Sequence, residues 1–206
     1  MTAADRTRHL ASFERGFTPI EALVAFVVLA VGIIGIISLL IMSKNSLHQS
    51  VQRTQAINLA DAMVERIRIN PTAIATYDDA DLANPVGESN PSTPPAVDCA
   101  VNRCSPAELA TFDLWSWKQS LMGESVVVDG ENVGGLIDPR ACITFTAQNG
   151  LVRSGLLNVV IQWHGLEESN DAVPADGVAC GGADPGQDPH RRQVVVNTFV
   201  VDESEF

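Results

Sequence analysis

The residues best suited to chemistry in this chain of 206 residues are four cysteines, Cys99, Cys104, Cys142 and Cys180. Four cysteines allow three pairings. We favour Cys99–Cys104, which closes a tight loop, and Cys142–Cys180, which ties an expected strand to a long excursion of the chain. A zinc site is disfavoured, because no C-x-x-C pair and no nearby histidine supply the usual ligand spacing. Disulfides are therefore the chemistry that we expect of these thiols.

The remaining reactive side chains form no recognisable catalytic or metal-binding motif. The sequence contains no G-x-S-x-G, S-x-x-K or H-E-x-x-H motif and no glycine-rich phosphate loop. We interpret His164 as a surface histidine at a strand end, and we expect local ion pairs around His190. Asp79 and Asp81 begin like a calcium loop, but the glycine and glutamate that such a loop requires are missing. The sequence thus predicts no enzyme, no cofactor and no metal site.

Glu21 stands directly before a long apolar segment. From Ala22 to Met42 there is no charged residue over 21 positions, which at about 1.5 Å per residue spans a hydrocarbon core of about 30 Å. An ionised carboxylate near hydrocarbon costs about 2.5–3.5 kcal/mol unless it is partnered. Glu21 therefore either pairs with a cation of a neighbouring molecule or lies among lipid headgroups, where its charge favours a helix N-terminus.

This segment separates a basic leader from an acidic remainder. The chain carries 13 basic and 25 acidic residues, a net charge of −12, whereas the first 16 residues carry +1. A basic leader before an apolar run predicts a short N-terminus inside and an extracytoplasmic remainder, where cysteines are oxidised. Because the acidic remainder lacks a basic patch, we expect no nucleic-acid partner. We favour a retained membrane anchor over a cleaved signal peptide. In the second case Gly32, Gly35 and Ser38 would provide the small residues of the cleavage site.

The residues around Glu21 carry a family resemblance. The run Arg15-Gly16-Phe17-Thr18-Pro19-Ile20-Glu21, followed by Ala-Leu-Val-Ala, resembles the class III signal of type IV pilins and pseudopilins. The resemblance implies that prepilin peptidase cuts after Gly16 and methylates the new amine on Phe17, and that Glu21 acts in subunit assembly. The amine of a neighbouring Phe17 would supply its cation. The family usually has leucine where this chain has Pro19, which suits a first helical turn.

A single long helix is expected to follow the leader. Apolar residues recur every three to five positions from Leu47 to Ile67, and neither glycine nor proline occurs between Leu39 and Asn70. We therefore expect a helix over residues 17–70, transmembrane over about 20–42, that ends before Pro71. Residues 72–98, with four prolines, are expected to form an irregular acidic connection.

Residues 71–206 are expected to form one extracytoplasmic α+β head. Ser105, Pro106 and Glu108 predict the start of a helix that runs to about Met122. Its two tryptophans lie two positions apart, so one is expected in the core and the other in a surface contact. Short β-rich runs predict an antiparallel sheet of three or four strands at Ser125–Asp129, Ala141–Ala147, Leu156–His164 and Gln193–Val201.

A second resemblance narrows the family. The sequence is similar to the PilV-like minor pilins, which are type IV pilus modification proteins, at Asp98-Cys99, at Cys104 to Trp117, at Val160 to Gly165, at Cys180-Gly181 and at Arg191-Arg192. It implies a structural subunit that acts in pilus assembly or initiation with prepilin peptidase, other minor pilins, the major pilin, the inner-membrane pilus assembly machinery and membrane lipid. The alternatives are a minor pseudopilin of a type II secretion system and, from another class, a membrane-anchored periplasmic enzyme.

Overall fold

A computed structural model describes residues 16–81, 85–87, 93–124, 126–132, 134–148, 150–169, 180 and 188–206. Residues 1–15, which make up most of the expected leader, lie outside these ranges. Parts of the expected connection 72–98 and of the excursion 167–189 also lie outside them. The chain divides into two compact units, residues 1–45 and residues 46–206, which are described separately.

The long helix is present as α1, Pro19–Ile69, with 51 residues. Proline occupies its first position, where the missing N–H needs no partner, and the helix ends just before Asn70-Pro71. In the first unit α1 is the only regular element among the described residues. The part of α1 in the second unit, residues 46–69, is here called its upper half. It belongs to the head, because six of its residues are buried: Gln52, Ala56, Ala60, Met63, Val64 and Ile67.

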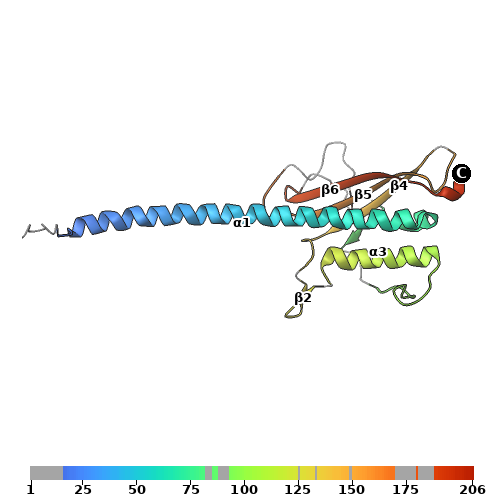
Figure 1. The fold of residues 1–206 in the computed structure, drawn as a ribbon, viewed down its shortest axis with the longest axis horizontal. Coiled ribbons are helices and arrows are strands. Elements are labelled where there is room, and N and C mark those ends of the chain that lie inside the picture. The colour runs from blue at the N-terminus through green and yellow to red at the C-terminus, as the bar shows by residue number, and fades with distance from the viewer. Residues whose placement is uncertain are drawn as a thin grey trace, which may run out of the picture. The chain divides into compact units, whose positions relative to one another are not determined.

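The head contains a four-stranded antiparallel sheet in the order β1-β4-β5-β6 (Figure 1). Its strands are β1 (Val86–Gly87), β4 (Arg140–Ala147), β5 (Gly155–His164) and β6 (Arg191–Val200). Cys142 lies opposite Val160, and Leu156 lies opposite Phe199. The three longer strands agree within two residues with the strands expected from the sequence.

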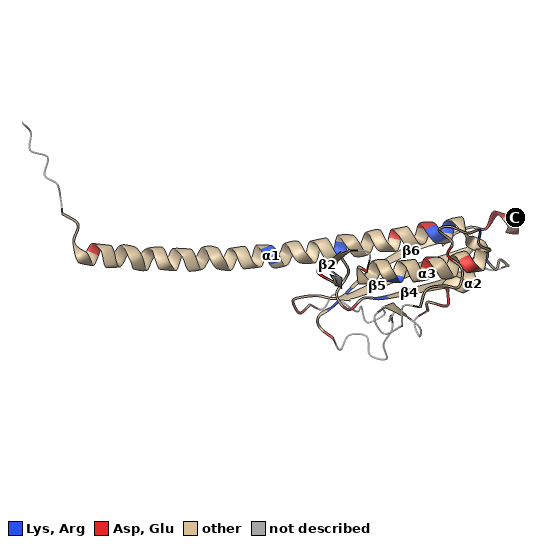
Figure 2. Ribbon diagram, turned by 90° about the horizontal axis from the view of Figure 1, so that it is seen from below, with Lys and Arg blue, Asp and Glu red and all other residues tan. Residues whose placement is uncertain are grey.

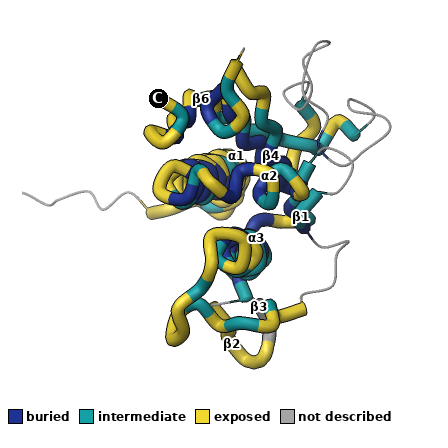
Figure 3. The backbone as a smooth tube through the Cα atoms, turned by 90° about the vertical axis from the view of Figure 1, so that its right-hand side faces the viewer, coloured by how far each residue is buried: buried dark blue, intermediate teal, exposed yellow. Residues whose placement is uncertain are grey.

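Two helices cover one face of this sheet, and Figure 3 shows the upper half of α1 and helix α3 (Pro106–Met122) side by side there. The two helices are antiparallel, since Trp117 contacts Leu59 whereas Pro106 contacts Asn70. Between them in sequence lie the 3-10 turn η1 (Pro71–Ala73) and the short helix α2 (Ile74–Tyr77). The core between helices and sheet contains Met63, Ile67, Tyr77, Trp117, Leu121, Ile143, Leu157, Val159 and Ile161. The observed class is the expected α+β fold, with a long helix, a shorter helix and a small antiparallel sheet.

The prediction that Ser125–Asp129 joins the main sheet is wrong. Its described part forms β2 (Val127–Val128), which pairs only with β3 (Glu131–Asn132) in a separate two-stranded hairpin. The reason is local, because Asp129 and Gly130 both have positive φ (54° and 89°), which reverses the chain at once. The edge of the sheet is taken instead by β1, where Gly87 lies so close to Pro139 that a Cβ atom would be 2.2 Å from its carbonyl oxygen.

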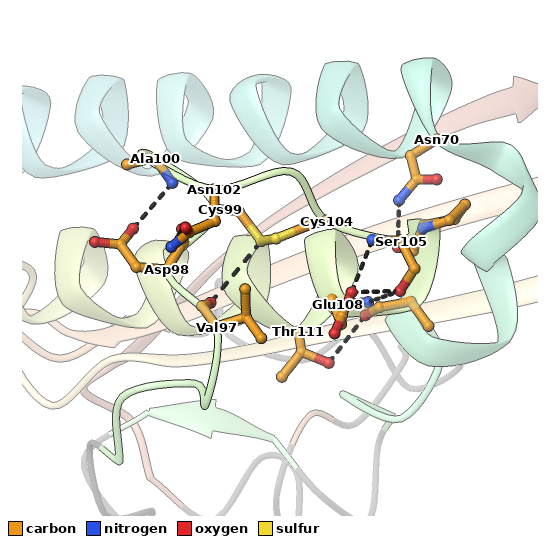
Figure 4. Close-up of a disulfide and its surroundings, with 12 residues drawn as sticks. Asn70, Val97, Asp98, Cys99, Ala100, Asn102, Cys104, Ser105, Glu108 and Thr111 are labelled. Atoms are coloured by element: carbon orange, nitrogen blue, oxygen red, sulfur yellow. Dashed lines mark hydrogen bonds between the residues drawn. A yellow bond between two sulfur atoms is a disulfide. The ribbon is translucent and has the colours of Figure 1, made fainter.

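Local signals set the limits of α3, and a disulfide closes the loop before it (Figure 4). Ser105 and Glu108 form a reciprocal capping box, and Gly123 ends the helix in a left-handed conformation. The structure contains the disulfides Cys99–Cys104 and Cys142–Cys180, which are the two pairings that the spacing favours. The second disulfide joins Cys180, which is buried, to Cys142 in β4.

Candidate functional site

The first turn of α1 presents the residues that the leader motif singles out. Gly16, Phe17 and Thr18 precede the helix without regular structure, and the Phe17 side chain is 70% exposed. Glu21 is exposed in the first turn, and its backbone N–H donates to the carbonyl oxygen of Thr18 at 3.0 Å. A carboxylate there is favourable to the helix dipole. Both the Gly16–Phe17 peptide bond and the Glu21 side chain are therefore open to another molecule.

The surface of α1 that follows is apolar on every side. Its most apolar window of 18 residues has a mean hydropathy of 3.1, and none of it is buried. Even Ile33, the least exposed large apolar side chain there, is 47% exposed. Figure 2 shows the corresponding long stretch of α1 without acidic or basic residues. Such a surface needs an apolar environment, and it fits a single-pass membrane anchor.

A shallow apolar hollow lies on this part of the helix. It has a volume of about 300 Å³ and is lined by Phe17, Ala22, Ala25, Phe26 and Leu29. The two alanines leave the helix backbone accessible between two aromatic rings. Small residues of this kind allow another helix to approach closely in lipid.

In the head, a buried polar network holds the end of α1 against α3. The Tyr77 hydroxyl donates to the Asp113 carboxylate at 2.7 Å, and Arg66 lies 3.5 Å from the other oxygen of that carboxylate. The Asn70 amide donates to Tyr77 at 3.3 Å and to the carbonyl oxygen of Pro106 at 2.8 Å. Burial, and then the hydrogen bond to Asp113, raises the pKa of Tyr77, so the phenol stays protonated as the donor. The network holds the C-terminal end of α1, and the residues that follow it, against α3.

The two histidines of the head lie together, which the sequence did not predict. The rings of His164 and His190 stack with centroids 5.2 Å apart. Asp188 lies 3.4 Å from His164 and 3.5 Å from Arg191, and Glu168 lies 3.9 Å from His190. The backbone N–H of His190 donates to Asp188 and lowers the pKa of that carboxyl. Of the local ion pairs expected around His190, the structure contains that between Asp188 and Arg191.

Lys118 is a second feature without a sequence signal. It is 5% exposed on α3, and its ammonium nitrogen has no hydrogen-bond partner among the described residues. Burial lowers its pKa, against the opposing effect of Glu124. The packing of α3 buries this position, and a lysine between Trp117 and Gln119 in the sequence does not predict it. Within the described ranges, no group of three or more His, Cys, Asp or Glu side chains is arranged to hold a metal ion.

Comparison with known proteins gives a match to a protein-family model over part of the chain. Residues 39–115 match the family model described as Type IV pilin Tt1218, from the end of the apolar segment through most of α3. No curated protein and no solved structure matches the chain. The matched region, which is less than half of the chain, is similar to type IV pilins.

Proposed function

We propose that this protein is a minor type IV pilin of the PilV-like kind, a structural subunit that takes part in pilus assembly or initiation with other minor pilins. One observation carries the proposal. A helical segment without charged or buried residues continues into an α+β head that contains two disulfides, and the match to type IV pilins begins within that segment and extends into the head. The head would lie in the periplasm, with the anchor in the inner membrane, until the subunit enters a pilus.

The proposed processing site is the peptide bond between Gly16 and Phe17. Cleavage there by prepilin peptidase removes residues 1–16, and methylation then modifies the amine of Phe17. The accessibility of this bond supports the proposal, because Gly16 has nothing within 4 Å of an added Cβ atom and Phe17 is exposed. The test is the intact mass of the protein from cells with and without the peptidase. A mass that still includes residues 1–16 when the peptidase is present would contradict this site.

The proposed role of Glu21 is to pair with the Phe17 amine of a neighbouring subunit. The pairing would satisfy a carboxylate in a low-dielectric environment and would fix the axial position of one helix against the next. We expect Glu21→Ala and Glu21→Gln to leave insertion and cleavage intact and to abolish incorporation into pili, which immunoblots of sheared pili measure. Glu203→Gln, which removes an exposed head carboxylate, is the matched control. Normal incorporation of both Glu21 variants would rule out this role.

The first alternative is a minor pseudopilin of a type II secretion system. A deletion strain separates the two functions when it is scored for surface pili, twitching and exoprotein secretion. The pilin proposal predicts loss of pili and twitching with normal secretion, and the reverse result would favour the pseudopilin. A membrane-anchored enzyme, the other alternative, would keep its activity in cells without prepilin peptidase.

A further inference from the structure

Strand β6 forms one edge of the four-stranded sheet, at the end away from α3 (Figure 3). Its pairing with β5 runs without interruption from Arg191, opposite His164, to Val200, opposite Gly155. Among the described residues no further strand continues the sheet beyond β6. From Gln193 to Val200 the strand has no charged residue, no proline and no bulge, which are features that usually protect a sheet edge from other chains. This edge is therefore suited to pairing with another strand.

The hydrogen bonds to β5 determine which backbone groups of β6 face the open edge. The N–H of Gly165 donates to the carbonyl oxygen of His190 at 2.7 Å, and the register of the two strands continues unbroken from there. Residues of an antiparallel pair alternate between bonding to their neighbour and pointing away from it, so the even-numbered residues of β6 bond to β5. The N–H and C=O groups of the odd-numbered residues from Gln193 to Phe199 therefore point to the open edge.

The apolar side chains of β6 are only partly covered. On the outer face of the sheet Val195 is 39% exposed and Phe199 is 45% exposed. On the inner face Val194 and Val196 pack against the core but remain half-buried. A strand beside β6 would cover more of these four side chains, which the burial of apolar surface favours, and it would also bond to the outward N–H and C=O groups.

The strand that matches this edge is β6 of a second copy, placed antiparallel around a two-fold axis at Val195. Val195 then lies opposite Val195 of the second copy, and Gln193 lies opposite Asn197. On the inner face Val194 lies opposite Val196. Apolar side chains thus face apolar ones and amides face amides, which are favourable cross-strand pairs, and no charge faces a like charge from Gln193 to Asn197.

Other registers match less well. Because the outward backbone groups belong to odd-numbered residues in both copies, one strand can shift against the other only in steps of two residues. A shift of two in either direction places Val195 opposite Gln193 or Asn197, so that a valine faces an amide. In the matched register the side-chain oxygen of Gln193 accepts from Gln162 at 2.7 Å within its own chain, and its NH₂ group can donate to Asn197 of the second copy. The sequence of β6 therefore specifies both the partner and the register.

We propose that the β6 strands of two copies pair antiparallel around a two-fold axis at Val195 and join their sheets into one continuous sheet. Both copies use the same surface, so the contact closes after two copies. Because β6 runs in the same direction as the upper half of α1 (Figure 1), the upper halves of the two copies point in opposite directions. The contact thus suits heads that approach each other from opposite directions. The inference does not require that the chain be a pilin, and its test is independent of pilus formation.

Cysteine cross-linking of the full chain in detergent tests the contact and its register. Val195→Cys places two thiols on either side of the two-fold axis, at a Cα separation of about 5.5 Å that a disulfide can span. Asn197→Cys is the matched control on the same face of β6, because its two copies would lie about 13 Å apart along the strand. We expect oxidation to join Val195→Cys to itself at least tenfold more than Asn197→Cys to itself. A mixture of Gln193→Cys and Asn197→Cys should cross-link as well as Val195→Cys.

Two results of this experiment would overturn the proposal. One is equal cross-linking of Val195→Cys and Asn197→Cys, each to itself, which would mean that the strands have no fixed register. The other is the absence of a Val195→Cys cross-link although maleimide labels the thiol. Intact mass shows in each case that the native disulfides persist.

A charge on the edge tests the same contact without a cysteine. Val195→Lys places two ammonium groups opposite each other across the two-fold axis, where like charges destabilise a strand pair. We expect it to weaken association at least tenfold in sedimentation of the full chain in detergent. Val201→Lys adds the same charge at a 47% exposed position just beyond the strand and is expected to associate like the parent. Thermal unfolding checks that both variants are folded, and association of Val195→Lys equal to that of the parent would overturn the proposal.

Discussion

Helix α1 has two different surfaces along one continuous backbone. Between residues 20 and 42 every large apolar side chain is at least 47% exposed. Between Gln52 and Ile67 six residues are buried at spacings of one to four, and polar residues occupy the other side. The backbone is helical in both regions, so helix formation alone does not distinguish them. The two regions differ in how apolar residues are arranged around the helix. Lipid or neighbouring helices can cover every side of the first region, whereas the sheet and α3 cover only one face of the second.

The largest effect is expected from a substitution that disrupts the packing of α3 against the upper half of α1. Trp117 is 2% exposed, and its indole N–H donates to the carbonyl oxygen of Leu59 at 3.0 Å. We expect Trp117→Ala to lower the free energy of unfolding by about 3–5 kcal/mol. Trp115→Ala is the control and is expected to cost less, because Trp115 is only half-buried, with its ring centroid 5.7 Å from that of Phe112. Denaturant unfolding of the full chain in detergent measures both, and equal losses would contradict this distinction.

The next largest effect is expected from a charge in the apolar segment of α1, residues 20–42, which should weaken membrane insertion and leave the head folded. Val31 is 66% exposed, and Val31→Lys places a charge near the middle of the apolar segment. We expect it to disfavour insertion by about 2.5–3.5 kcal/mol and to shift the protein out of carbonate-resistant membranes. Val152→Lys, at a 74% exposed position in the head, is the matched control and is expected to remain membrane-bound. If both variants remain in the membrane, residues 20–42 are not the anchor.

A smaller effect is expected from a substitution in the buried polar network at the end of α1, and it tests how much that network stabilises the head. Tyr77→Phe removes the hydroxyl that donates to Asp113 and leaves a buried carboxylate with one partner fewer. We expect a loss of about 1–3 kcal/mol in the free energy of unfolding. Thr111→Val, which removes an exposed hydroxyl bonded to the carbonyl oxygen of Ala107, should have almost no effect. A similar loss in the two variants would mean that the buried network has no special role.

The smallest effect concerns pH. Hydrogen bonds from Ser204, and then Arg153, lower the pKa of Asp202. A depressed folded pKa gives stability that is present above the ordinary carboxyl pKa of about 4 and is lost as pH falls through the folded value. Asp202→Asn should therefore be less stable than the parent at pH 7, and the gap should narrow below about pH 4. Thermal unfolding against pH measures it, with Glu203→Gln as control, and a gap independent of pH would contradict this assignment.

The sequence predicted the elements whose limits depend on neighbouring residues. The start of α3 follows from Ser105, Pro106 and Glu108, and α1 ends where Pro71 disfavours helix at Asn70. The prediction was wrong at Ser125–Asp129, where alternating composition could not tell a hairpin from a strand of the main sheet. It also missed β1, which has two residues and exists only because Gly87 fits closely beside Pro139.

The α+β class, the apolar segment, the long helix and the capping of α3 could all be predicted from the sequence. These features depend on side chains within a few turns of one another, where spacing and composition contain the information. Three features became known from the folded structure alone: His164 stacks on His190, Lys118 is buried, and the hairpin β2–β3 is separate from the main sheet. Long-range packing brings these groups together, and local sequence carries no record of it.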